Sequence, residues 1–68
     1  MNVNLRQAVL QKVREKNTEE LSQVVDDSVG GDDRVLPGLG VLFEIIWEHS
    51  EPDTQKILIQ ILKEHMPE

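Results

Sequence analysis

Cysteine is absent from this chain of 68 residues. Its absence excludes disulfide bonds and thiolate zinc sites, two common means of stabilising a small domain. A chain of this length buries only about 60% of the surface that its unfolded form exposes, so its own core is small. Association with a second chain is the aid to stability that the composition still allows. We therefore expect a single domain over residues 1–68 that belongs to a homo-oligomer.

Long apolar runs are also absent. The longest are Val41-Leu42-Phe43 and Ile45-Ile46-Trp47, which Glu44 separates, whereas a membrane-spanning helix needs about 20 apolar residues in succession. The first residues lack the basic stub and apolar stretch of a secretory signal. We expect a cytoplasmic protein with no membrane contact.

Positive charge is scarce overall, because the formal net charge is −6. Such a charge disfavours nucleic acid as a partner. The charge is uneven, however: residues 1–16 are basic, and residues 17–33 hold six acids and no base. We expect the basic segment to pair with the acidic one, within a chain or between chains. An alternative is weak DNA binding by the basic side chains, which are Arg6, Lys12, Arg14 and Lys16.

The first half of the chain predicts two helices with apolar residues at helical spacing. One begins at an Asn cap, Asn2 or Asn4, and the next begins at Asn17 or Thr18. The pair Gly30-Gly31 ends the second helix, because glycine adopts the left-handed conformation at little cost. The residues expected to face the core are Leu5, Ala8, Val9, Val13, Leu21, Val24, Val25 and Val29.

The second half predicts two further helices. The third has Pro37 near its first position, after a possible extended lead-in at Val35-Leu36. The fourth has a Ser50 cap and Pro52 in its first turn. The apolar side chains expected in their core faces are Leu39, Leu42, Phe43, Ile46, Trp47, Ile57, Leu58, Ile61 and Leu62. Without two-residue alternation, the pattern predicts an all-α bundle of about four short helices, which homodimerisation could complete.

The polar residues predict no catalytic, cofactor or metal site. Two histidines, His49 and His65, are sixteen positions apart and lack the spacing of a helical metal pair. The acids around Gly30-Gly31 come in adjacent pairs, which does not match a calcium loop. The glycines of Gly38-Leu39-Gly40 lack the context of a phosphate loop, and we expect them to permit close packing. No small-molecule substrate is evident.

The third helix is the most apolar and is the candidate interface. A helix with so broad an apolar surface is either central in its bundle or covered by another subunit. The candidate residues are Leu36, Pro37, Gly38, Leu39, Gly40, Val41, Leu42, Phe43, Ile46 and Trp47.

The same segment carries a family resemblance. Leu36-Pro37-Gly38-Leu39-Gly40-Val41-Leu42-Phe43-Glu44 is followed by Ile45-Ile46-Trp47, and the chain opens with Asn4-Leu5-Arg6 and Ala8-Val9. Together these strings, over essentially the whole chain, closely resemble the small acid-soluble spore protein I family. The resemblance implies a minor, non-enzymatic protein of the forespore and spore core, with a structural or interaction role in sporulation, dormancy or outgrowth. It supplies no catalytic residues, ligand or cofactor. The partner that we expect is the chain itself or an unknown spore protein.

Overall fold

Four α-helices and one 3-10 turn account for most of residues 4–67, which are the residues that the computed structural model describes. The elements are α1 (Leu5–Val13), α2 (Thr18–Ser28), η1 (Asp33–Val35), α3 (Leu36–Glu48) and α4 (Pro52–Glu64). No strand occurs among these residues, so the expected all-α fold is confirmed. Nor is any helix in residues 4–67 both long and apolar enough to cross a bilayer.

Asparagine side chains fix the starts of α1 and α2. The Oδ1 atom of Asn4 accepts a hydrogen bond from the Gln7 backbone N–H at 3.3 Å. At α2 the Asn17 side chain accepts from the Glu20 N–H at 2.8 Å, and the Glu20 carboxylate accepts from the Asn17 N–H at 3.0 Å. This reciprocal capping box pairs two backbone donors that the helix itself leaves free. Asn4 and Asn17 are therefore the caps, and the alternative Asn2 lies outside the described residues.

A glycine turn reverses the chain between α2 and α3. Gly30 has φ of +74°, the left-handed conformation that the sequence predicts there. Asp32 then caps η1 by accepting a hydrogen bond from the Arg34 N–H at 2.8 Å. The predicted extended lead-in at Val35-Leu36 is wrong, because η1 runs directly into α3. Pro37 lies in the first turn of α3, as predicted.

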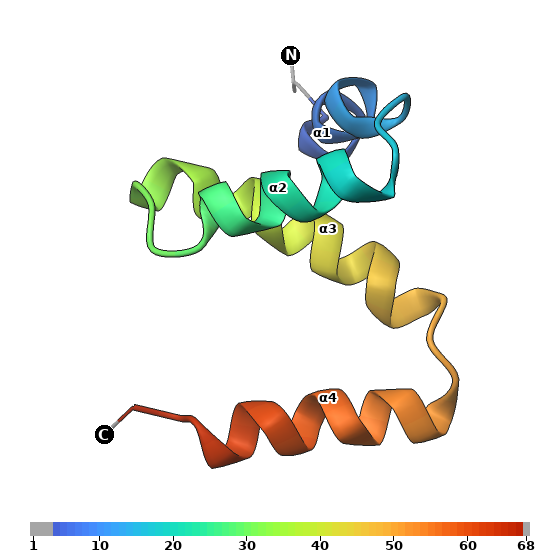
Figure 1. Ribbon diagram of the computed structural model, residues 1–68, viewed down its shortest axis with the longest axis vertical. Coiled ribbons are helices and arrows are strands. Elements are labelled where there is room, and N and C mark those ends of the chain that lie inside the picture. Colours follow the sequence, from blue (N-terminus) through green and yellow to red (C-terminus); the bar gives the residue numbers. More distant parts are fainter. Residues whose placement is uncertain (1–3, 68) are drawn as a thin grey trace.

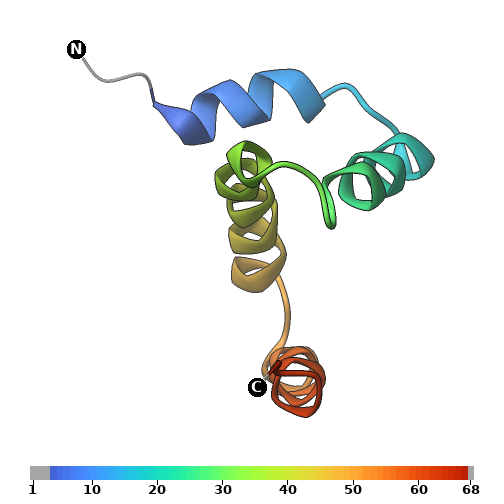
Figure 2. The same ribbon diagram turned by 90° about the vertical axis from the view of Figure 1, so that its left-hand side faces the viewer.

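Helix α3 is the central element of the fold. It packs against α1, α2 and η1 (Figures 1 and 2). Val41 in its middle is only 8% exposed and is the one buried residue in the described part of the chain. At Gly38 an added Cβ would lie 3.7 Å from Cγ2 of Val9, so this glycine does face a neighbouring helix. Gly40 faces open space, and the packing role expected for it is wrong within a single chain.

Helix α4 stands apart from the other three helices. Both ribbon views place it beyond the C-terminal end of α3, on the opposite side of the molecule from α1 (Figures 1 and 2). The predicted Ser50 cap is wrong: Ser50 Oγ donates to the Ile46 carbonyl at 2.6 Å, and Glu51 occupies the cap position without a side-chain hydrogen bond. Pro52 does begin the helix, which ends at Glu64, before Pro67.

Candidate interaction surface

Helix α3 presents two apolar faces, and only one of them is covered. Val41 lies toward Leu5 and Arg6 of α1, and Ile45 lies toward residues of α1 and α2. Phe43 and Ile46 are 47% and 48% exposed. The expectation that these two side chains belong to the core is therefore wrong for the single chain. Ile46 lines an open groove with residues of α1 and α2, and Phe43 lines a shallow depression with Ile59 of α4.

The ten candidate residues all lie on α3 but differ in exposure. Val41 is buried, and four others are half-buried. The remaining five are exposed. The half-buried residues are Gly38, Leu39, Leu42 and Trp47, and the exposed ones are Leu36, Pro37, Gly40, Phe43 and Ile46.

An apolar groove runs between α1, α2 and α3. It has a volume of about 330 Å³, and α4 contributes no residue to it. Two basic side chains, Arg14 and Lys16, line it beside the apolar ones. We call this the α1–α3 groove; its apolar lining is Val13, Leu21, Val25, Leu42, Ile45 and Ile46.

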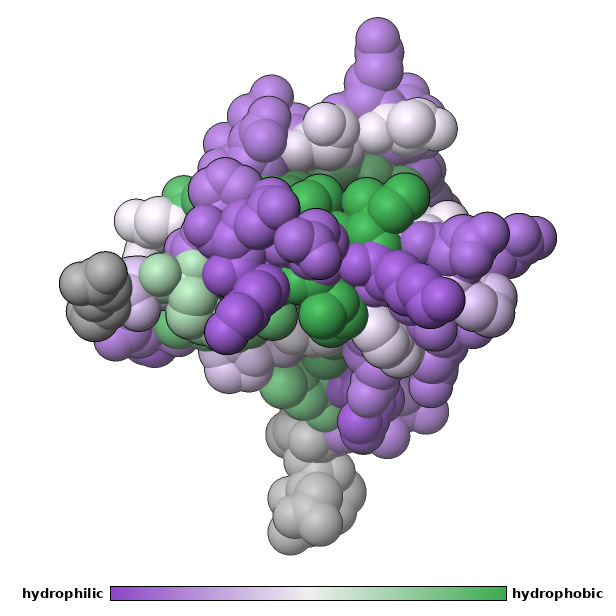
Figure 3. Space-filling model, turned by 90° about the horizontal axis from the view of Figure 1, so that it is seen from below, coloured by the Kyte–Doolittle hydropathy of each residue, from purple (hydrophilic) through white to green (hydrophobic). Residues whose placement is uncertain are grey.

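A second apolar surface lies on α4. Ile57, Ile61 and Leu62 are 59%, 52% and 54% exposed, and we call these three residues the α4 ridge. The sequence predicts them in the core, and that prediction is wrong because α4 has no helix packed along this side. Seen from the side of α4, hydrophobic side chains form a central patch bordered by hydrophilic ones (Figure 3).

Helix α4 touches α3 through its other side. Gln55 Nε2 donates a hydrogen bond to the Trp47 carbonyl at 2.8 Å. Ile59 lines a shallow depression with Phe43 and Trp47, whose ring centroids are 6.0 Å apart. Residues two positions apart on a helix are separated by about 200° around its axis. Ile57 therefore points roughly opposite to Gln55 and Ile59, away from its own α3.

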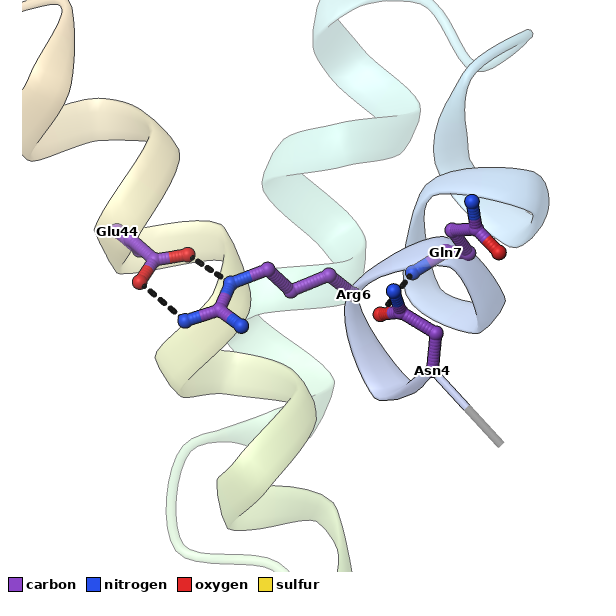
Figure 4. A network of polar contacts seen from close by, with 4 residues as sticks. All are labelled: Asn4, Arg6, Gln7 and Glu44. Carbon is purple, nitrogen blue, oxygen red and sulfur yellow. Dashed lines mark hydrogen bonds and ion pairs between the residues drawn. The ribbon is translucent and has the colours of Figure 1, made fainter. Parts of the chain in front are cut away.

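A bidentate ion pair joins α1 to α3 (Figure 4). Arg6 Nε and Nη2 donate to the two carboxylate oxygens of Glu44 at 2.6 and 2.8 Å. The hydrogen bond from Arg6 lowers the pKa of Glu44, and the bond to Glu44 raises the pKa of Arg6. Such fork-to-fork geometry fixes orientation as well as distance. The pair sets how α1 crosses α3, and it occupies one of the four basic side chains of residues 1–16.

This ion pair differs from the expected one. In residues 4–67 no ion pair joins the basic side chains of α1 to the acids of α2, so the predicted pairing within one chain is wrong. Arg6 and Glu44 are 38 positions apart, and no local pattern links residues at that separation. Neither this pair nor the exposure of the α4 ridge is predicted by the sequence.

The polar side chains of residues 4–67 form no evident reaction centre. His49 Nδ1 donates to the Ile45 carbonyl at 2.9 Å and His65 Nδ1 to the Ile61 carbonyl at 2.8 Å, so each imidazole is bound to its own helix end. Within the described part of the chain, no group of three His, Cys, Asp or Glu residues is placed to hold a metal ion. What this arrangement offers chemically is apolar surface with a few charges at its border.

Comparison with known proteins gives the family. The family model for small, acid-soluble spore protein I matches residues 3–66. The protein of that name from Bacillus subtilis is 39% identical over 64 residues, which cover 93% of this chain and 90% of the relative. Those from Bacillus licheniformis and Geobacillus kaustophilus are 38% and 35% identical over 65 residues, or 94% of this chain and 93% and 94% of the relatives. No solved structure matches the chain. The chain belongs to the small, acid-soluble spore protein I family.

Proposed function

We propose that this spore protein is a non-enzymatic component of the spore core that acts in sporulation, dormancy or outgrowth by binding another protein chain. Its family membership supports the spore setting. The observation that supports binding to another protein is the apolar surface left uncovered on α3 and α4. On α3 this surface includes Phe43 and Ile46, and on α4 it is the α4 ridge.

Uncovered apolar surface is costly in water. Removing it from solvent contributes about 25 cal/mol for each Å², and contiguous apolar patches on soluble proteins mark interaction sites. The surface on α3 and α4 belongs to a chain of net charge −6. Such a surface suits the apolar side chains of a protein partner and offers little to a phosphate backbone.

DNA binding by α1 is the competing function. Arg6 is held by Glu44, which neutralises one of the four basic side chains. The other three, Lys12, Arg14 and Lys16, are exposed, but they stand beside an acidic segment. We therefore favour the protein partner and treat DNA as an outcome that the experiment can reveal.

The test is photo-crosslinking inside spores. A photoreactive amino acid replaces Ile46, an exposed residue of α3, in one strain and Glu19, an exposed residue of α2, in the control strain. We expect irradiation of dormant spores to attach a protein to position 46 in much higher yield than to position 19. Equal yields at both positions, no protein adduct, or a nucleic-acid adduct alone would contradict the proposal.

The location has its own test. Spores are stripped of their coats and cortex before the core is ruptured, and the protein is followed by immunoblotting. We expect it to remain with the intact core and to appear in the soluble fraction only after rupture. Release together with the coats would place it outside the core and overturn that part of the proposal.

A further inference from the structure

The chain exposes far more surface than a compact monomer of its size. A folded monomer of 7.8 kDa is expected to expose about 4,400 Å², whereas this chain exposes 6137 Å². Its radius of gyration is 13.4 Å, against about 11 Å for a compact domain of 68 residues. The excess is about 1,700 Å² per chain.

This excess has the size of an obligate dimer interface. Obligate homodimers bury about 2,000–5,000 Å² in total, or about 1,000–2,500 Å² for each subunit. The excess of the present chain falls within that range. A second copy that covered this surface would bring the exposed area of each chain to that of a compact protein.

The α4 ridge and the α1–α3 groove have complementary shapes and charges. The ridge is a row of branched apolar side chains, and the groove is lined mostly by apolar residues. On the helical wheel Asp53 and Glu64 lie next to Ile57, at the border of the ridge. Arg14 and Lys16 line the groove, so the acidic border of a ridge would meet basic side chains there.

A chain does not fill its own groove. Helix α4 is joined to α3 by residues 49–51 alone, and it contacts α3 through Gln55 and Ile59, which lie on the side of α4 away from Ile57 and Ile61. Each chain therefore carries one free ridge and one free groove. In a two-fold symmetric pair both ridges and both grooves are covered at once, which closes the assembly at two copies.

We propose that the protein is a homodimer in which α4 of each copy places its Ile57, Ile61 and Leu62 ridge in the α1–α3 groove of the other. The inference rests on the proposed function, because it names the chain that covers the interaction surface. Bacterial spores would then contain this protein as a dimer. The exposed side chain of Phe43, which does not line the groove, would remain for further contacts.

Sedimentation equilibrium tests the dimer. At roughly 100 µM a dimer of micromolar affinity is saturated, and we expect twice the 7.8 kDa of the chain. Ile61→Glu places a charge in the ridge and should lower the dimer affinity at least tenfold. Gln60→Glu adds the same charge at the next residue, on the polar side of α4, and should leave the affinity within about twofold. Circular dichroism of both variants shows whether the helices persist.

Cross-linking tests the arrangement and does not depend on a disruptive variant. Because the chain has no cysteine, one introduced thiol per copy is unique. We expect an equimolar mixture of Ile46→Cys and Ile61→Cys chains to form the mixed disulfide under mild oxidation. A mixture of Glu19→Cys and Ile61→Cys should not, because position 19 lies outside the groove.

The outcomes separate this inference from the proposed function. A monomer at roughly 100 µM overturns the dimer, as does a dimer that Ile61→Glu leaves intact and that forms no mixed disulfide between positions 46 and 61. If position 46 still captures a different protein in spores, the proposed function stands and the second copy is the wrong occupant. If position 46 captures no protein, the proposed function fails as well.

Discussion

Gly30 and Gly40 allow the same chemical change to be compared at two positions where opposite effects on stability are expected. Gly30 has φ of +74°, and no atom lies within 4 Å of a Cβ added there, so the cost of alanine is conformational. Left-handed backbone costs an L-residue about 1–2 kcal/mol, and alanine recovers about 0.4–1 kcal/mol by restricting the unfolded chain. We expect Gly30→Ala to lower the free energy of unfolding by about 1 kcal/mol.

Gly40 lies inside α3, and an added Cβ meets nothing within 4 Å there either. It does not have a positive φ, and alanine is more stable than glycine in a helix by about 0.5–1 kcal/mol. We expect Gly40→Ala to raise the free energy of unfolding by that amount. The two variants should differ by about 1.5–2 kcal/mol.

Thermal unfolding followed by circular dichroism measures the difference. For a domain of this size 1 kcal/mol shifts the Tm by about 4–8 °C, so the variants should lie on either side of the unchanged protein. All samples need the same protein concentration, because association makes the Tm depend on it. An unchanged Tm for Gly30→Ala would refute the left-handed turn. A lower Tm for Gly40→Ala would show that another chain covers this side of α3.

Three further changes test the caps, the ion pair and the core. Asn17→Ala removes the α2 cap and should cost about 1 kcal/mol in urea unfolding, whereas Thr18→Ala, one residue later, should cost less. The pKa of Glu44 is lowered in the folded protein, so its pair with Arg6 stabilises the fold above the ordinary carboxyl pKa and stops doing so as the pH falls through the folded pKa. Glu44→Gln should therefore be less stable than the unchanged protein at pH 7 and equally stable in acid. A difference in stability that persists in acid would contradict this. Val41→Ala removes two buried carbon atoms and should lower the urea midpoint by the equivalent of about 2 kcal/mol; no change would mean that Val41 is not the centre of the core.

The sequence predicts the helices of this fold well because their boundaries are local. Asn17 with Glu20 three residues later, Gly30 after α2 and Pro37 at the start of α3 each satisfy or remove backbone groups within one turn. Such interactions involve neighbours in the chain, so spacing alone reveals them. Ser50 is the exception: its hydroxyl bonds back to the Ile46 carbonyl and leaves the cap to Glu51.

The packing of the helices could not be predicted in the same way. Helix α3 is apolar on nearly every side, so its periodicity does not indicate whether Val41 or Phe43 faces α1. The α4 pattern correctly indicates an amphipathic helix, but the apolar ridge that it predicts is left free by the single chain. Periodicity shows that a face needs covering and does not show which chain covers it. The same reasoning makes α3 a candidate interface, and it does not indicate that the ridge on α4 lies free.

The hydrogen bond from Gln55 to the Trp47 carbonyl lies where α4 meets α3, and fluorescence can detect changes at this contact. Trp47 is the only tryptophan, and the chain has no tyrosine, so nearly all of its near-ultraviolet emission comes from the point where α4 meets α3. Its indole lies beside Phe43 and Ile59, and a shift of α4 along α3 changes the polarity around it. The fluorescence of Trp47 therefore reports changes in the angle between α3 and α4 without any added label.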